Sequence, residues 1–177
     1  MSFLPFKDIH PQLGKNIWLA PGAFVIGDVT IGDNTNIWFN TVVRGDVNTI
    51  TIGTATNIQD NSTIHVTQKT GPTHIGSYVT IGHQCTIHAC RIDDYTLIGM
   101  GTVILDKAHI PEYAMIGAGS LVTAKSQLKS HWLHVGSPCQ AVRPLKEAEI
   151  EYLKVSALNY IETSANYSKA DIGTTSP

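Results

Sequence analysis

A period of six residues runs through most of this chain and limits what it can fold into. An aliphatic residue recurs at every sixth position, often with glycine after it, and the register shifts only a few times. A strict period of six does not suit an α-helix, but it suits short strands separated by turns. Such repeats stack, and each buries its apolar residues only against its neighbours. The repeat positions are Val25, Ile31, Ile37 and Val43, then Ile52, Ile58 and Ile64, then Ile75, Ile81 and Ile87, and finally Ile92, Ile98, Ile104, Ile110, Ile116 and Val122.

Composition excludes several classes of function. A chain of 177 residues suits one domain, and a net charge of −2 with 15% charged residues predicts no surface for nucleic acid or an anionic membrane. The first ten residues hold no long apolar run, so neither a signal peptide nor a membrane span is expected. Cys85, Cys90 and Cys139 are odd in number and lack C-x-x-C spacing. We therefore expect no disulfide framework and a cytoplasmic location.

The repeat covers only the central part of the chain. A turn-rich loop interrupts it at residues 66–74, and Pro144 opens a segment whose apolar stripe predicts an amphipathic helix. We expect five parts: a lead-in at 1–16, the stacked repeats at 17–124, an irregular connection at 125–143, a helix at 144–167 and a frayed polar tail at 168–177.

Three histidines fall in this pattern close to the interrupting loop. His65 and His88 each directly follow a repeat isoleucine, so they occupy the same slot, and His83 occupies the third slot of its own hexapeptide. Neutral imidazoles that a repeating scaffold places can converge on one metal ion and leave a coordination position open. Three exposed loop histidines are the alternative. The shared slot favours a metal site formed by His65, His83 and His88.

Two short runs precede these histidines. V-R-G-D-V spans residues 43–47 and N-I-Q-D spans residues 57–60, and G-H-x-x-x-x-H then ends at His88. Together these motifs resemble the γ-class carbonic anhydrases, in particular the bacterial carbonic-anhydrase-like proteins with a short loop between the first two ligand histidines. The resemblance covers about residues 10–165. It implies an all-β fold, a left-handed parallel β-helix of hexapeptide repeats with a C-terminal α-helix packed on it.

The resemblance also implies a homotrimer with zinc held between subunits, which acts on CO2 and bicarbonate as small-molecule substrates. His65 and His88 would come from one chain and His83 from its neighbour. The spacing agrees, because His65 and His88 lie 23 positions apart, one coil of three hexapeptides plus a loop. Zinc held in this way activates water to attack CO2, although Fe2+ or Co2+ also suits three imidazoles. In such a β-helix Cys85 faces the core, and Cys90 is only a weak candidate ligand.

Further residues match family positions near the site. Arg44, Asp46 and Asp60 match a charge network near the site and across the subunit contact, and surface charges on turns are the alternative. Gln59 and Asn57 match residues that line the pocket, where an amide could orient CO2 or the attacking water. Their alternative role is a ladder of amide side chains that satisfies turn backbone groups.

The C-terminal helix and the route by which the proton leaves involve further residues. Tyr160 or Tyr167 could reach the pocket from the helix, as a tyrosine does in some relatives, or could simply pack there. The best-characterised family pattern has a glutamate where this chain has Val47, and another in an acidic loop, whereas residues 66–74 contain no carboxylate. His74 is the loop's one group that titrates near neutrality. We therefore expect weak hydration activity.

Two other functions fit the same scaffold. A hexapeptide acyltransferase, or another enzyme acting on CoA esters, uses a single catalytic histidine near a subunit interface. A non-catalytic trimeric scaffold with a structural metal would explain the vacant proton-shuttle positions. Metal content separates the first alternative from a carbonic anhydrase, and CO2 hydration separates the second.

Overall fold

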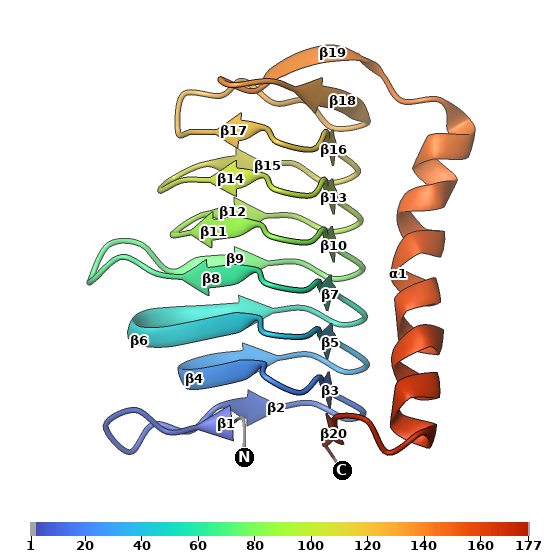
Figure 1. The fold of residues 1–177 in the computed structure, drawn as a ribbon. Helices are drawn as coiled ribbons and strands as arrows, with labels where there is room; N and C mark the ends of the chain where they lie inside the picture. The colour runs from blue at the N-terminus through green and yellow to red at the C-terminus, as the bar shows by residue number, and fades with distance from the viewer. Residues whose placement is uncertain (1–2, 177) are drawn as a thin grey trace.

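The repeat aliphatic residues form one column of core through a three-sided β-prism. The computed structural model describes residues 3–176 (Figure 1). Ile58, Ile64, Ile81, Ile87 and Ile98 are all completely buried inside the prism. Successive side chains of a strand point to opposite faces, so the neighbours of each isoleucine point outwards. The expected all-β repeat architecture with a C-terminal helix is confirmed, and its left-handed winding stays a prediction.

Each coil contributes one short strand to each face of the prism. Face 1 consists of β3 (Trp18–Leu19), β5 (Asn36–Ile37), β7 (Asn57–Ile58), β10 (Thr80–Ile81), β13 (Leu97–Ile98), β16 (Met115–Ile116) and β18 (Trp132–Val135). Face 2 consists of β1 (Phe3–Leu4), the first halves of β4 (Phe24–Ile31) and β6 (Val42–Ile52), β8 (Thr63–His65), β11 (Thr86–His88), β14 (Val103–Ile104) and β17 (Leu121–Val122). Face 3 consists of β2 (Gln12–Leu13), the second halves of β4 and β6, β9 (Thr73–Ile75), β12 (Arg91–Ile92) and β15 (His109–Ile110). Neighbouring strands within each of these faces run parallel.

Side chains stack along the corner between faces 3 and 1. The rings of Tyr78, Tyr95 and Tyr113 are parallel within 7° with centroids 4.9 Å apart, and His131 continues the stack at 4.8 Å. All four residues have a positive φ between 54° and 61°, which non-glycine residues adopt at a cost. Their spacing equals that of adjacent strands in a sheet. We call this stack the aromatic column, and it holds the turns of successive coils in line.

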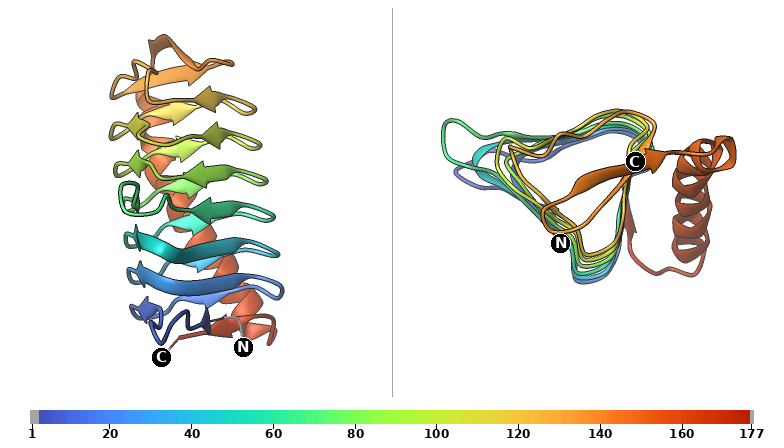
Figure 2. Two further views of the ribbon diagram at one scale, coloured as in Figure 1. Left: turned by 90° about the vertical axis from the view of Figure 1, so that its left-hand side faces the viewer. Right: turned by 90° about the horizontal axis from the view of Figure 1, so that it is seen from above.

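Helix α1 (Glu147–Lys169) stands beside the prism and packs on face 1, as the view along the prism axis shows (Figure 2). It buries Leu153, Ser156, Ala157 and Ser164. It begins three residues later than expected because Pro144 belongs to β19 (Gln140–Pro144), where it pairs with Trp132. Among residues 3–176, no helix is both long and apolar enough to cross a membrane.

The expected lead-in, irregular connection and frayed tail each contain short strands. Within the lead-in, β1 and β2 pair with β4 and belong to the first coil. Within the connection at 125–143, β18 pairs with β16, and β19 folds back on β18. Within the tail, β20 (Thr174–Thr175) pairs antiparallel with β3. In the last two cases the added strands cover sheet edges that the first and last coils would otherwise leave unpaired.

Candidate functional site

His65 and His88 lie at the corner between faces 2 and 3, at the ends of β8 and β11. Each follows a buried isoleucine, so each side chain points outwards from the prism. The two residues are direct partners in the parallel register, and Nδ1 of His65 lies 3.2 Å from Nε2 of His88. The shared slot in the repeat therefore does place two imidazoles side by side.

A carboxylate contacts the other nitrogen of each ring. Nε2 of His65 lies 2.9 Å from Oδ1 of Asp46, and Nδ1 of His88 lies 2.6 Å from Oδ1 of Asp106. An ionised carboxylate only accepts hydrogen bonds, so each of these nitrogens carries the proton of its neutral ring. The two nitrogens that face each other therefore both present lone pairs.

Both carboxylates are held in the ionised form. For Asp46, burial opposes ionisation, but hydrogen bonds from His65 and Arg44 and the charge of Arg44 outweigh burial and keep the pKa below its ordinary value. For Asp106, hydrogen bonds from Thr67 and His88 lower the pKa. The tautomers of the two histidines follow from these charges.

Nδ1 of His65 and Nε2 of His88 lie 3.2 Å apart. Two lone pairs on nitrogens this close repel each other unless a cation or a shared proton lies between them. Two nitrogens bound at 2.0–2.1 Å to a tetrahedral zinc ion are about 3.3 Å apart. The spacing of His65 and His88 matches that distance, and neutral imidazole is a common ligand of Zn, Fe and Co. The pair therefore fits two ligands of a metal ion.

His83 lies at a different corner. It is in the turn after β10, between faces 1 and 2, and its Nδ1 lies 2.8 Å from Oδ2 of Asp60. Within residues 3–176 of a single chain, no three His, Cys, Asp or Glu side chains lie close enough together to hold a metal ion. One chain thus brings His65 and His88 together but leaves His83 apart, with its Nε2 free of the carboxylate.

A cavity of about 330 Å³ adjoins His83 and contains both predicted tyrosines. It is lined by Trp38, Phe39, Asp60, His83, Tyr160, Thr163 and Tyr167. Burial and then the charge of Asp60 raise the pKa of Tyr160, so its phenol stays protonated. The rings of Tyr160 and Tyr167 both pack edge-on against Trp38, at centroid distances of 5.3 and 5.5 Å. The two tyrosines therefore both line this cavity and pack the helix.

Asn57 and Gln59 belong to a buried hydrogen-bond chain under α1. Nε2 of Gln59 donates to Oδ1 of Asn57 at 3.1 Å, and Nδ2 of Asn57 donates to Oγ1 of Thr80 at 2.9 Å. The Thr80 hydroxyl lies 3.0 Å from that of Ser156 on the helix. Asn57 is completely buried. In the single chain these amides connect the prism to its helix.

Some of the remaining predicted residues lie at the corner of His65 and His88, and others lie elsewhere on the surface. Arg44 forms an ion pair with Asp46, which completes a chain from Arg44 to His65. Val47 is next to Asp46 and is 42% exposed. His74 lies outside the turn between β8 and β9, in β9 on face 3, where its Nδ1 lies 2.7 Å from the Thr51 hydroxyl.

The cysteines are core residues. Cys85, Cys90 and Cys139 are all less than 5% exposed. Burial raises the pKa of the Cys85 thiol to about 11 and that of Cys90 to about 12. A metal ligand has to be a thiolate, so both residues are structural, as expected for Cys85.

Asp106 is the site residue that sequence reasoning missed. It lies one coil after His88, since Ile87 pairs with Ile104 and Leu105 therefore stands in the slot of His88. An alignment of the coils beneath one another would place Asp106 directly past that slot. The repeat positions alone gave no reason to include it.

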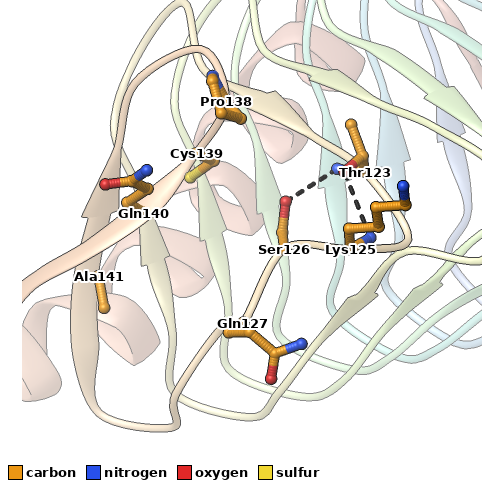
Figure 3. Close-up of a pocket in the computed structure, with 8 residues that line it drawn as sticks. All are labelled: Thr123, Lys125, Ser126, Gln127, Pro138, Cys139, Gln140 and Ala141. Atoms are coloured by element: carbon orange, nitrogen blue, oxygen red, sulfur yellow. Dashed lines mark hydrogen bonds between the residues drawn. The ribbon is translucent and has the colours of Figure 1, made fainter.

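A further cavity of about 500 Å³ lies at the C-terminal end of the prism (Figure 3). It is lined by Thr123, Lys125, Ser126, Gln127, Pro138, Cys139, Gln140 and Ala141. None of the predicted site residues contributes to it.

Comparison with known proteins agrees with the fold and the motifs. Residues 10–45 match the family model described as bacterial transferase hexapeptide (six repeats). The chain is 48% identical to a probable carbonic anhydrase of Methanocaldococcus jannaschii, over 86% of this chain and 96% of that protein. It is 43% identical to the mitochondrial gamma carbonic anhydrase 1 of Arabidopsis thaliana, over 86% of this chain and 58% of that protein. A solved structure of a putative acetyltransferase from Bacillus cereus superimposes with a TM-score of 0.91 at 36% identity, over 95% of this chain and 97% of that one.

Proposed function

The chain belongs to the γ carbonic anhydrase family, and we propose that it hydrates CO2 reversibly to bicarbonate at a zinc ion shared between subunits of a homotrimer. The observation that carries this proposal is that Nδ1 of His65 and Nε2 of His88 lie 3.2 Å apart, while a carboxylate contacts the other nitrogen of each ring. His83 from the adjacent subunit would be the third ligand. Three histidine ligands leave a position open for chemistry.

The outward side chains of face 2 support a shared site. This face joins the corner of His65 and His88 to the corner of His83. On face 2 the outward residues directly before the buried aliphatic residues are apolar or small, and Arg44, His65 and His88 follow the buried residues beside the site. The equivalent outward position on face 3 includes two histidines and an arginine. The outward residues of face 2 include Phe24, Val42, Thr63, Thr86, Val103 and Leu121, and those of face 3 include Thr51, His74, Arg91 and His109. Face 2 is therefore the better surface to bury against a second copy.

Symmetry then determines which residues meet. Rotation about a threefold axis parallel to the prism keeps every residue at its own height. His83 and His88 belong to the same coil, so the His83 corner of one subunit would meet the His88 corner of the next. Such a contact is heterologous and closes into a ring. Each of three sites would then hold His65 and His88 from one subunit and His83 from another.

Residues of the chain have distinct roles in this proposal. When bound, zinc would supply Lewis-acid activation of water near neutral pH. Asp46 and Asp60 would hold the rings of His65 and His83, and Arg44 would balance the charge of Asp46. Gln59 uses Nε2 for Asn57, so its Oε1 remains to accept a hydrogen bond from water.

The proton must leave the site after each turnover, and the usual carboxylates are missing. The side chain of Val47 has no titratable group, and residues 66–74 contain no carboxylate. His74 remains a candidate acceptor from face 3. Slow proton exit favours one alternative, a trimeric scaffold whose metal is structural. A cytoplasmic location, without nucleic-acid or membrane partners, stays a prediction from the sequence.

An acyltransferase is the other alternative, and the Bacillus cereus relative is described as a putative acetyltransferase. Transferase chemistry needs one histidine as a base, and it does not require two facing lone pairs. Elemental analysis of the purified trimer, with stopped-flow CO2 hydration after loading with zinc, Fe2+ or Co2+, tests the proposal. We expect one metal per subunit and metal-dependent hydration. A metal-free protein that transfers acetyl groups from acetyl-CoA would contradict it.

A further inference from the structure

Asp106 links three coils of the prism at the metal-site corner. Its Oδ1 accepts a hydrogen bond from Nδ1 of His88, and its Oδ2 accepts one from the hydroxyl of Thr67. Thr67 lies 39 residues earlier, in the loop that follows His65. Both oxygens of the carboxylate are therefore occupied, one by a candidate ligand and one by the loop.

Thr67 is itself held in place by several contacts. Its backbone pairs with Gly71 in both directions, at 2.8 and 3.2 Å, and Nδ2 of Asn48 donates to its carbonyl at 3.0 Å. Gly71 permits this closed loop, because a Cβ there would lie 2.8 Å from the Cβ atoms of both Ala89 and Thr67. The loop between β8 and β9 projects beyond the neighbouring turns (Figure 1). Its residue Thr67 is held by the hydrogen bonds described above.

We infer that Asp106 is a positioning residue for His88 and that Thr67 holds Asp106 in the orientation this requires. The role in metal binding rests on the proposed function. Without Asp106, the ring proton of His88 is free to move from Nδ1 to Nε2. The nitrogen that faces His65 would then carry a hydrogen and could not bind a metal ion. Loss of such partners commonly weakens metal binding by about 10–100-fold.

An aspartate–histidine pair outside the proposed site provides a control. Oδ2 of Asp93 lies 2.7 Å from Nε2 of His109, and its Oδ1 accepts from Nε of Arg91 at 2.7 Å. The contact distance is close to the 2.6 Å of Asp106 and His88, although it involves Nε2 rather than Nδ1, and the pair lies on face 3, away from the proposed site. A general effect of removing a histidine-bound carboxylate would appear in both pairs.

The first experiment measures zinc affinity by competition with a chelator in the original protein and four variants. We expect Asp106→Ala to weaken binding about 10–100-fold, and Thr67→Val to weaken it by a smaller factor because Asp106 keeps its contact with His88. Asp93→Ala should bind as the original protein does. Asp106→Asn retains an oxygen that can accept from Nδ1 and should bind more tightly than Asp106→Ala. Equal affinities for Asp106→Ala and Asp93→Ala would overturn the inference.

The second experiment needs no metal and separates this inference from the proposed function. Nitrogen-15 NMR of the metal-free protein above pH 8, where imidazoles are neutral, reports which nitrogen carries the proton. We expect the proton of His88 on Nδ1 in the original protein and in Asp93→Ala, and a large Nε2-protonated fraction in Asp106→Ala. An unchanged tautomer in a folded, trimeric Asp106→Ala protein would reject the positioning role. A protein that binds no zinc but shows this tautomer shift would reject only the proposed function.

Discussion

His65 and His88 are 23 residues apart in the chain, yet they are direct partners across two adjacent parallel strands. The loop between β8 and β9 takes up the residues in excess of one coil, so the two rings come into register in spite of the insertion. Their facing nitrogens lie 3.2 Å apart. A single chain therefore carries two thirds of the proposed metal site.

The first prediction concerns these two ligands. His65→Ala and His88→Ala should each weaken zinc binding by more than the roughly 10–100-fold that loss of a supporting partner costs. Zinc content after dialysis against a chelator measures this effect. His109→Ala, which also removes a histidine paired with an aspartate, is the control and should retain its metal. Retained zinc in either ligand variant would contradict the assignment.

The second prediction tests whether His83 comes from a neighbouring subunit. Neither His65→Ala nor His83→Ala alone should bind zinc. When the two variants are unfolded together in equal amounts and refolded, chains combine at random into trimers. A site is intact where an His83→Ala chain supplies His65 and His88 and an adjacent His65→Ala chain supplies His83. About one quarter of all sites should therefore recover their metal, from the ring geometry. No recovery in verified mixed trimers would show that all ligands come from one chain.

The third prediction concerns proton exit. If Val47 and the carboxylate-free loop limit turnover, added imidazole buffer should raise the rate of CO2 hydration, and Val47→Glu should raise it without buffer. Val142→Glu places the same charge at another exposed valine, on β19, and should have no effect. Stopped-flow hydration at several buffer concentrations measures this. If neither added buffer nor Val47→Glu changes the rate of CO2 hydration, proton transfer does not limit turnover in this protein.

The fourth prediction separates the two roles of Asn57. Asn57→Ala removes the acceptor of Gln59 and a donor to Thr80 inside a buried chain, so it should lower the free energy of unfolding by about 1–3 kcal/mol. Zinc affinity should stay within twofold. Denaturant unfolding at one fixed protein concentration measures stability, and exposed Asn159→Ala is the control. Normal stability with weakened CO2 binding would instead place Asn57 in the substrate pocket.

The fifth prediction concerns His134, which is completely buried near the last coil. Its Nε2 accepts a hydrogen bond from the backbone N–H of Lys129 at 2.9 Å, and burial lowers its pKa. The unfolded chain therefore binds a proton first as pH falls. Stability should be complete above about pH 7 and decrease below about pH 6.5, by at most about 1.4 kcal/mol per pH unit for this group.

The variant that checks this pH dependence is His134→Gln. It should be less stable at pH 8 but lose less stability than the original protein between pH 7 and pH 5. His10→Gln, at an exposed histidine, should keep the original slope. Identical slopes for His134→Gln and the original protein would contradict the prediction.

The period of six residues predicted the features of the structure that follow directly from the repeat. The buried isoleucines and the stacking of His65 on His88 follow from register, because parallel coils place equivalent slots side by side. The ends of the prism could not be predicted in this way. Strands β1, β2 and β20 are two residues long and have no period, and each forms because an existing strand offers a partner.

The site was predictable where it lies on repeat slots and not where side chains cross between coils. Asp106 contacts His88 from the next coil, and Thr67 reaches it from a loop whose shape depends on Gly71. The buried chain from Gln59 to Ser156 depends on how α1 docks, which no repeat position encodes. The proposed role of His83 requires a second subunit, which the repeat positions of one chain do not describe.

The aromatic column makes the order of the coils visible to spectroscopy. Closely stacked tyrosine rings couple electronically, so near-ultraviolet circular dichroism of Tyr78, Tyr95 and Tyr113 depends on each ring keeping its neighbour. Tyr78 lies between β9 and β10, in the coil that leads to His83, while Tyr113 lies between β15 and β16, two coils further along. If the prism unfolds first from its C-terminal end, the contribution of Tyr113 to this signal should be lost while the coils that carry His65, His83 and His88 are still folded.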